Sequence, residues 1–276
     1  MLSSTMERFI EEDIGDWDDS SSLVAEDLEA YAAIIAREEC IISGLSEAVQ
    51  IFQHFGLSAR PLYDDGEFVP AESTVMSIRG SARAILQSER LALNFLGRMS
   101  GISTLTRQCM LAAGGRVRIA ATRKTTPGFR AWEKKAVFLG GGDTHRFNLS
   151  GAVLIKDNHI KIYGLEECLR LARQRASFTK KIEVEVESLP DMLAAAQGGA
   201  DIIMFDNMAP QMIAEGVKHL CEKGLRGRII LEASGGIRPE NVHEYSECGV
   251  DVLSLGALTR DARWIDLSLE MSTQKN

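Results

Sequence analysis

The sequence predicts an α/β protein built from a small N-terminal α+β domain and a larger domain of alternating β and α segments. Two observations predict the larger domain. After Gly115, six short apolar runs alternate with amphipathic segments, which is typical of a parallel sheet covered by helices. Charged side chains also follow most of these runs, as at the functional rim of a β/α barrel. Before Gly115, short extended segments lead into one long helical pattern.

The N-terminal domain is predicted over residues 1–114. A short helix over residues 4–12 is broken by Gly15 and a run of Asp and Ser, which favour turns. Helical spacing of apolar residues predicts a helix over residues 46–56 and a long one over residues 81–115. The expected strands cover residues 28–36, 40–44, 59–63, 67–71 and 74–80.

The second domain is predicted over residues 115–276, and whether its last residues pack back on the first domain stays open. Its expected strands cover residues 117–122, 152–156, 182–186, 201–205, 228–232 and 251–255. Its expected helices cover residues 128–140, 164–176, 189–199, 210–224 and 239–249. Such a series forms either a doubly wound sheet or a barrel. The first strand is not followed by GxGxxG, which disfavours a dinucleotide-binding sheet.

Composition excludes several classes of function. The chain has 276 residues and a formal net charge of -8, which argues against a general nucleic-acid or membrane-surface binder. Five scattered cysteines without a CxxC pair favour reduced thiols over disulfides or a zinc site. Neither a signal peptide nor an apolar run of the ~20 residues that a membrane span needs is present. We expect a cytoplasmic protein.

A basic segment stands out in this acidic chain. Residues 123–161 hold eight Lys or Arg against three acids. A solvated basic face is the simpler interpretation. However, these charges follow strand ends and glycines, which favours a site for small anions. Guanidinium groups and ammonium groups together suit a ligand with both carboxylates and phosphates.

The strand ends supply candidate site residues. Those with charge are Arg123, Lys124, Lys156, Glu183, Glu185, Asp206 and Glu232. Glu183 and Glu185 share one strand face, so spacing alone cannot separate them. The last two strand ends instead offer backbone amides and a hydroxyl, which can hold a phosphate, at Ser234, Gly235, Gly236 and Gly256.

Several motifs resemble one enzyme family over nearly the whole chain. They are TRKTTPG, AVLIKDNH, EVEVES, FDN, EASGGI and GALT, with IIAREE and SERLALNFLGRMSGIST in the N-terminal domain. The chain resembles the quinolinate phosphoribosyltransferase family (nicotinate-nucleotide pyrophosphorylase, carboxylating). The resemblance implies a type II phosphoribosyltransferase fold, with a small α+β sandwich domain and an irregular, incomplete β/α barrel. It also implies a homodimer, or a higher oligomer, in which one subunit's N-terminal domain caps the other's barrel.

The resemblance implies a pentosyltransferase of NAD biosynthesis that uses Mg2+. Quinolinate and phosphoribosyl pyrophosphate would give nicotinate mononucleotide, pyrophosphate and CO2. Quinolinate would be bound by Arg123, His145, Arg146 and Lys156, with Arg90 from the neighbouring subunit. Catalytic roles fall to Lys124, Lys156, Glu185 and Asp206, with Glu185 and Asp206 also holding the metal. The 5-phosphate would lie on Ser234, Gly235, Gly236 and Gly256.

Some positions depart from the family pattern, among them Thr144, Asn148 and the stretch after GALT. They leave room for a relative with a different pyridine substrate, although the intact LIKDNH favours quinolinate. A second hypothesis is a barrel aldolase that forms a Schiff base on Lys156 or Lys124. A third is a non-catalytic ligand sensor, which the presence of Lys124, Glu185 and Asp206 disfavours.

Overall fold

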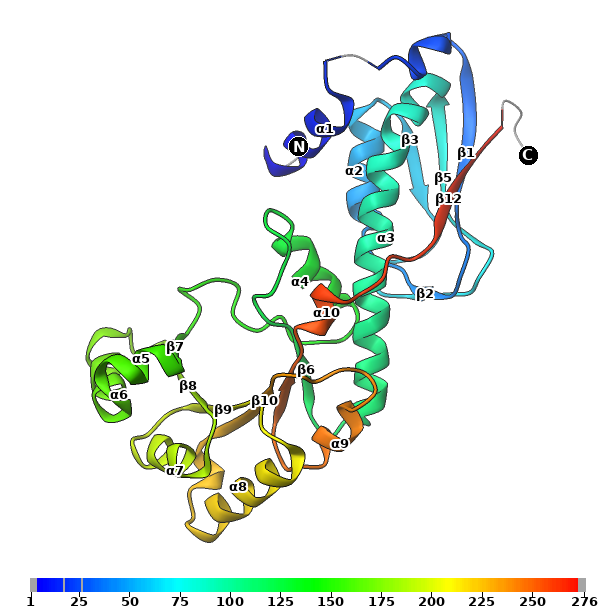
Figure 1. Cartoon of the computed structure of the whole chain (residues 1–276). Helices are drawn as coiled ribbons and strands as arrows, with labels where there is room; N and C mark the ends of the chain where they lie inside the picture. The colour runs from blue at the N-terminus through cyan, green and yellow to red at the C-terminus, as the bar shows by residue number, and fades with distance from the viewer. Residues whose placement is uncertain (1–3, 17, 26, 273–276) are drawn as a thin grey trace. The chain divides into compact units, whose positions relative to one another are not determined.

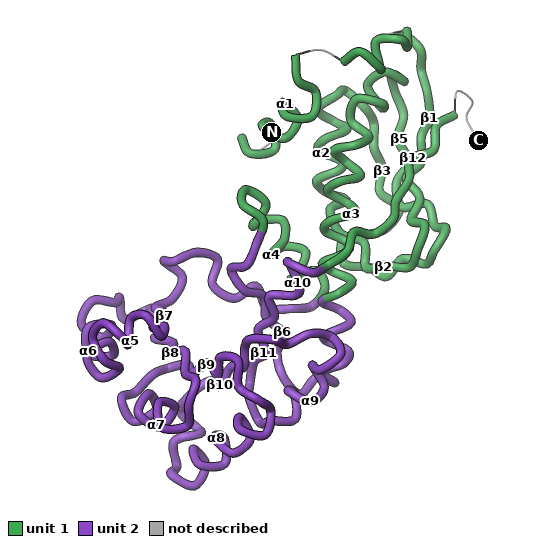
Figure 2. Tube along the Cα trace, in the orientation of Figure 1, with its two compact units in different colours: residues 1–105, 126–140, 262–276 green, residues 106–125, 141–261 purple. Residues whose placement is uncertain are grey.

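The chain divides into two compact units (Figure 2). A computed structural model describes residues 4–16, 18–25 and 27–272. Unit 1 comprises Met1–Leu105, Thr126–Gly140 and Ala262–Asn276, and unit 2 comprises Thr106–Thr125 and Gly141–Asp261. This division differs from the predicted boundary at residue 114. The long helix contributes residues to both units, and two later segments of the chain belong to unit 1.

An antiparallel sheet forms the frame of unit 1. Among the described residues it has four strands in the order β12-β1-β5-β3. They are β1 Glu29–Ala36, β3 Ser58–Pro61, β5 Ser73–Ser81 and β12 Leu267–Ser272. Burial alternates along β1, so that every second side chain faces the core. A short ribbon pairs β2 Cys40–Ile41 with β4 Phe68–Val69.

The helices of unit 1 differ in burial: the helix at residues 4–14 buries Met6 and Ile10, whereas residues 91–103 of the long helix are almost all buried. They are α1 Ser4–Ile14, α2 Leu45–His54, α3 Ala82–Ala113, which continues into unit 2, and α4 Arg130–Leu139. Within unit 1, α2 and α3 run alongside the sheet (Figure 1). The ring of Phe9 on α1 lies 5.6–6.1 Å from those of Phe95, Phe129 and Trp132. This aromatic cluster joins α1, α3 and α4 in one core.

The chain returns to unit 1 at its C-terminal end. β12 pairs antiparallel with β1, from Ala36–Leu267 to Tyr31–Ser272. Before β12, the backbone passes directly over α3, where a Cβ on Gly101 would lie 1.9 Å from the Arg263 carbonyl oxygen. Since no side chain fits in that space, Gly101 allows the crossing. The C-terminal stretch that departs from the family pattern therefore completes the N-terminal sheet.

Unit 2 is an open barrel, as predicted. In the part of the chain that the structure describes, its sheet has six parallel strands in the order β6-β11-β10-β9-β8-β7. They are β6 Arg118–Ala120, β7 Val153–Ile155, β8 Ile182–Val186, β9 Ile202–Asp206, β10 Ile230–Ser234 and β11 Val252–Ser254. The first strand of this unit, β6, pairs with the last, β11, and the barrel stays open between β6 and β7.

Helices follow the strands of unit 2 and cover their outer side (Figure 1). They are α5 Asp157–Tyr163, α6 Leu165–Arg175, α7 Leu189–Gln197, α8 Pro210–Glu222, α9 Val242–Ser246 and α10 Ala257–Arg260. Two 3-10 turns, η1 Ser21–Leu23 in unit 1 and η2 Arg226–Arg228 in unit 2, complete the elements. The helix predicted over residues 128–140 exists as α4 but belongs to unit 1, which corrects the expected barrel.

Buried polar contacts explain the place of α4. Ser103 on α3 donates a hydrogen bond of 2.7 Å to the Ala136 carbonyl on α4. The Lys135 ammonium lies 2.8 Å from Glu47 on α2. These partners all belong to unit 1, and such pairings cannot be seen in a helical spacing pattern.

Candidate active site

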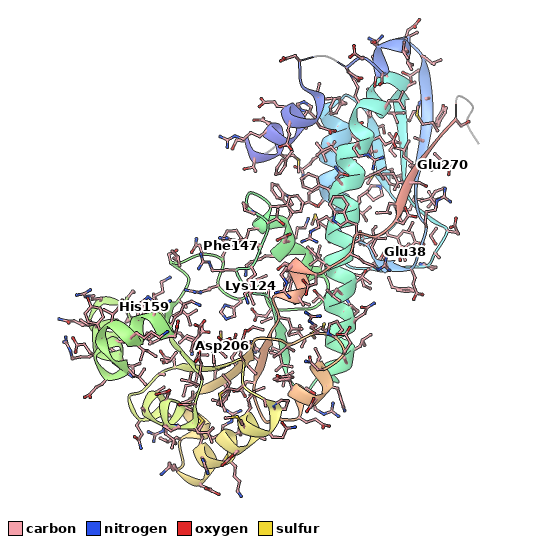
Figure 3. The ribbon with its side chains drawn as sticks, in the orientation of Figure 1. Glu38, Lys124, Phe147, His159, Asp206 and Glu270 are labelled. Carbon is pink, nitrogen blue, oxygen red and sulfur yellow. The ribbon has the colours of Figure 1, made fainter. Side chains whose placement is uncertain are left out.

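A pocket of about 330 Å³ lies at the carboxyl ends of the unit 2 strands. Figure 3 labels two of the residues that line it, Lys124 and Asp206. The full lining is Ala121, Thr122, Arg123, Lys124, His145, Arg146, Leu154, Lys156, Glu185, Met204, Asp206, Glu232, Ser234 and Ser254. Eight of these residues have a site role implied by the family resemblance, and all eight belong to unit 2.

Strand register explains why these side chains meet. Residues paired across neighbouring parallel strands point to the same face of the sheet. Met204 on β9 pairs with Glu185 on β8 and Glu232 on β10. Two residues further along the same strands, Asp206 on β9 pairs with Ser234 on β10. Because all of them face the barrel interior, they form successive layers of polar groups at its mouth.

The cations of the pocket are closely grouped. Lys156 precedes α5, where its backbone N–H donates to His159 Nδ1 at 3.0 Å, and its ammonium donates to Glu185 Oε1 at 2.7 Å. Burial lowers the pKa of the Arg146 guanidinium, and the charge of Arg123 also lowers it, whereas the charge of Glu183 opposes both. Arg123 Nε is buried and has no acceptor among the described residues. A bound anion would supply one.

Lys124 is held by its own loop and by the segment after β11. Its backbone N–H donates to Thr122 Oγ1 at 3.1 Å, and its carbonyl accepts a hydrogen bond of 2.7 Å from Thr259 Oγ1 on α10. A Cβ on Gly256 would lie 2.9 Å from Lys124 Cδ. The absence of a side chain at Gly256 thus lets the lysine stem lie across this glycine.

The turn after β10 requires glycine. Gly235 and Gly236 have φ angles of +90° and +65°, which residues other than glycine rarely adopt. A Cβ on Gly235 would also lie 2.2 Å from Asn207 Oδ1. Gly235, Gly236 and Gly256 are not among the residues that line the pocket; of the predicted phosphate-binding residues, only Ser234 lines it.

Two buried acids lie beside the imidazole of His145, and one of them, Glu232, also lines the pocket. Glu183 on β8 is 0% exposed and Glu232 on β10 is 2% exposed. His145 Nε2 lies 3.3 Å from Glu232 Oε2 and 3.8 Å from Glu183 Oε1. Burial and the neighbouring charge of Glu232 raise the pKa of Glu183 to about 7, against the opposing charge of His145. The donor atoms of the three residues lie within 4.8 Å of one another.

Arg90, like the three glycines, is a predicted site residue that does not line the pocket. It lies on α3 within unit 1. Its charge acts on Asp13 on α1: burial raises the pKa of Asp13, and the charge of Arg90 opposes this effect.

Sequence reasoning assigned no role to several pocket residues. Glu232 stood out as a strand-end charge, and Glu183 could not be separated from Glu185. The two-residue period of β8 places both on the interior face, and only the structure shows that Glu183 lies below the pocket lining. The apolar and hydroxyl-bearing residues carried no distinct signal; these are Thr122, Leu154, Met204 and Ser254.

The positions that depart from the family pattern do not line this pocket. Asn148 Oδ1 accepts hydrogen bonds from the backbone N–H and the hydroxyl of Ser150, at 3.0 and 2.7 Å. It therefore shapes a local turn.

The open barrel and its pocket define a class of protein. Polar layers at the carboxyl ends of parallel strands are the catalytic face of β/α-barrel enzymes. Guanidinium and ammonium groups beside carboxylates and hydroxyls fit a substrate with several negative charges and a metal ion. The fold and site are those of a barrel enzyme that acts on a small polyanion.

Comparison with known proteins gives the family. A model of the C-terminal domain of quinolinate phosphoribosyl transferase matches residues 102–270, and a model of its N-terminal domain matches residues 18–100. The chain belongs to the quinolinate phosphoribosyl transferase family. Membership confirms the resemblance that the motifs indicated.

Individual relatives agree over nearly their full length. The chain is 45% identical over 256 residues to the probable nicotinate-nucleotide pyrophosphorylase (carboxylating) of Methanothermobacter thermautotrophicus, covering 91% of this chain and 92% of the relative. It is 37% identical over 246 residues to the human enzyme of that name, covering 88% and 82%. The structure of the nicotinate-nucleotide pyrophosphorylase from Francisella tularensis matches with a TM-score of 0.90 at 35% identity, covering 97% and 94%.

The structure also bears on the expected absence of a membrane span. In the described part of the chain, no helix combines the length and the apolar character that crossing a membrane requires.

Proposed function

We propose that this chain transfers a phosphoribosyl group from phosphoribosyl pyrophosphate to quinolinate, and that the product loses CO2 to give nicotinate mononucleotide. The observation that carries the proposal is the pocket of unit 2. It joins Arg123, Arg146 and Lys156 to Lys124 and Asp206 in about 330 Å³, a volume suited to a small ligand. The names of the relatives support the same reaction.

Quinolinate carries two adjacent carboxylates on a pyridine ring. The guanidinium groups of Arg123 and Arg146 can each bind a carboxylate through two donors, and Lys156 adds a point charge. The buried Arg123 Nε that lacks an acceptor among the described residues supports this assignment. Three cations with different geometries favour a dicarboxylate over a monocarboxylate such as nicotinate.

The other side of the pocket would bind phosphoribosyl pyrophosphate. Lys124 would neutralise the departing pyrophosphate, while Ser234 and the glycine amides beyond it would hold the 5-phosphate. As pyrophosphate leaves, positive charge develops on the sugar, and the carboxylates of Glu185 and Asp206 stabilise that charge.

The donor set also fits Mg2+. The ion prefers oxygen ligands, usually one or two carboxylates together with substrate phosphates. Glu185 and Asp206 both line the pocket, and they would hold it. Bound there, Mg2+ would neutralise the pyrophosphate and orient it.

Decarboxylation follows from the chemistry of the ring. Once the ring nitrogen is bonded to the sugar it carries a positive charge, which stabilises the electron pair left on the neighbouring carbon as CO2 departs. That carbon then takes up a proton from solvent to give the mononucleotide. The protein would hold the remaining carboxylate on its cations while excluding water from the departing one.

A homodimer with shared sites is part of the proposal. Arg90 belongs to unit 1 and does not line the pocket of its own chain, so a second subunit would supply it. Arg90→Ala should lose most activity and keep its fold by circular dichroism. A mixture of inactive Arg90→Ala and inactive Lys124→Ala subunits should regain activity in mixed dimers. Wild-type activity in Arg90→Ala, or no recovery in the mixture, would place Arg90 outside the site.

Product analysis tests the reaction itself. The purified protein is incubated with phosphoribosyl pyrophosphate, Mg2+ and either quinolinate or nicotinate, and released CO2 and mononucleotide are measured. We expect turnover with quinolinate and none with nicotinate. No turnover with either substrate would favour a relative that acts on another pyridine. A covalent adduct trapped by borohydride would instead favour the aldolase.

A further inference from the structure

The buried Thr259 on α10 has no role in the proposed reaction so far. We propose that it is a positioning residue, whose hydroxyl fixes the backbone of Lys124 so that the lysine ammonium stays where pyrophosphate departs. The inference rests on the proposed function for its kinetic consequence. Thr259 is not among the residues that line the pocket, so it would act on the reaction only through Lys124.

The first step concerns the loop that carries Lys124. This residue is exposed, and its ammonium stands at the end of a flexible four-carbon stem. Lys124 is the central residue of a three-residue turn, in which the Thr125 N–H donates to the Arg123 carbonyl at 2.9 Å. The turn uses the carbonyl of Arg123, whereas the carbonyl of Lys124 bonds to a partner outside the loop.

The second step concerns that partner. Thr259 Oγ1 donates to the Lys124 carbonyl at 2.7 Å, although 135 positions separate the two residues along the chain. Thr259 is 1% exposed, and a buried group that loses its hydrogen bond costs the protein free energy. The helical bond from the Arg260 N–H to the Gly256 carbonyl, at 3.0 Å, holds the turn of α10 that carries this hydroxyl. The hydroxyl is therefore a fixed anchor for the loop.

The third step concerns the lysine stem. A Cβ on Gly256 would lie 2.9 Å from Lys124 Cδ, so the stem runs against the backbone just before α10. The two loops leave the sheet side by side, because β6 and β11 are paired and the Leu255 N–H donates to the Ala120 carbonyl at 2.9 Å. One segment, residues 256–259, thus contacts Lys124 at its backbone and at its stem.

A purely structural bond of the same kind exists in unit 1. The hydroxyl of Ser103, which is 0% exposed, donates to the Ala136 carbonyl, also at 2.7 Å. The two bonds share donor type, acceptor type, length and burial. They differ in the residue that accepts, because Lys124 lines the pocket and Ala136 carries only a methyl group. Ser103 is therefore the matched control for Thr259.

Crystal structures of variants test the position of Lys124 without any activity. Thr259→Val keeps the shape of the side chain and removes its hydroxyl, whereas Thr259→Ser keeps the donor. We expect Lys124 in its wild-type position in Thr259→Ser. In Thr259→Val its carbonyl should turn away and its stem should leave Gly256. Thr259→Ala removes the same donor and serves if Thr259→Val does not fold. An unchanged Lys124 in a variant that lacks the hydroxyl would overturn the proposal.

Kinetics test the consequence. Thr259→Val should lower kcat by about tenfold and leave the KM for quinolinate within about twofold, because the Arg123 carbonyl is held within its own turn. Thr259→Ser should stay near wild type. Ser103→Ala should be less stable to urea than wild type and keep its kcat. Thr259→Ser behaving like Thr259→Val, or an equal loss of kcat in Ser103→Ala, would overturn the proposal.

A double variant tests whether Thr259 acts through Lys124. In a Lys124→Met background, Thr259→Val should change kcat by less than about twofold, because the side chain that it positions is already gone. A loss of kcat as large as in the wild-type background would show that Thr259 acts independently of Lys124. If the wild-type protein turned over neither substrate, the proposed function would fail, while the crystal structures would still decide the position of Lys124.

Discussion

Each unit of this protein buries a glutamate completely, and the two have opposite surroundings. Glu133 in unit 1 and Glu183 in unit 2 are both 0% exposed. Glu133 accepts hydrogen bonds from Arg98 at 3.2 and 2.6 Å, and from the backbone and hydroxyl of Thr126 at 3.0 and 2.9 Å. Neither oxygen of Glu183 has a hydrogen-bond partner among the described residues.

The difference separates two uses of a buried charge. A carboxylate whose acceptor sites are filled is a structural cross-link, here joining α3, α4 and the chain before α4. A carboxylate left without donors stays responsive to its surroundings, and such groups cluster at functional sites. Burial alone therefore does not mark function; the number of hydrogen-bond partners does.

One pocket from each unit supports the same point. Each has a volume of about 330 Å³. The one in unit 1 is lined largely by rings and apolar side chains, among them Phe9, Phe95, Phe129 and Trp264. The one in unit 2 is lined by charges. Size does not distinguish them, whereas chemistry does.

The largest effect on stability is expected at Glu133. Glu133→Ala removes the carboxylate that pairs with the largely buried Arg98 guanidinium, which should cost about 3–5 kcal/mol of the free energy of unfolding. Urea denaturation measures it. Glu47→Ala is the control and should cost less, because its partner Lys135 is partly exposed and also lies 3.5 Å from Asp65. Equal losses in the two variants would contradict the distinction drawn for Glu133.

Lys124 should show the opposite behaviour, with activity lost and stability kept. Lys124→Met removes the charge that faces the departing pyrophosphate, and kcat should fall by about 100-fold or more. Lys135→Met, which removes a lysine that pairs with Glu47 in unit 1, should lower the melting temperature instead and leave kcat near wild type. Similar kcat values for both variants would contradict the role of Lys124 in neutralising the departing pyrophosphate.

A smaller, pH-dependent effect is expected at Glu183. The folded protein raises the pKa of this group from 4.5 to about 7, so the folded state holds its proton more tightly than the unfolded state. Its contribution to stability is complete below pH 4.5 and is lost as the pH rises through about 7. Glu183→Gln cannot titrate. Its stability relative to wild type should therefore rise between pH 4.5 and pH 8, by on the order of 1–3 kcal/mol.

Unfolding curves at several pH values measure this difference. Glu187→Gln replaces an exposed carboxylate just beyond the same strand. The difference between its unfolding free energy and that of the wild type should not change with pH. A flat difference for Glu183→Gln as well would mean that the buried acid is charged at all these pH values.

Much of this architecture could be predicted from the sequence. Near-continuous apolar runs gave all six barrel strands, and the charge that follows them placed Lys156 and Asp206 in the pocket. Local patterns failed where distant contacts decide. The helix over residues 128–140 has the spacing of a barrel helix, and only its contacts with distant residues, such as those of Glu133 with Arg98 and of Ala136 with Ser103, show that it belongs to unit 1. The spacing of Glu183 and Glu185 is equally uninformative, because both point to the barrel interior.

A crystal structure with bound quinolinate tests the account most directly. We predict both carboxylates on the cations of the unit 2 pocket, among them Arg123, Arg146 and Lys156. Quinolinate in the aromatic pocket of unit 1, or carboxylates that contact none of these cations, would contradict it.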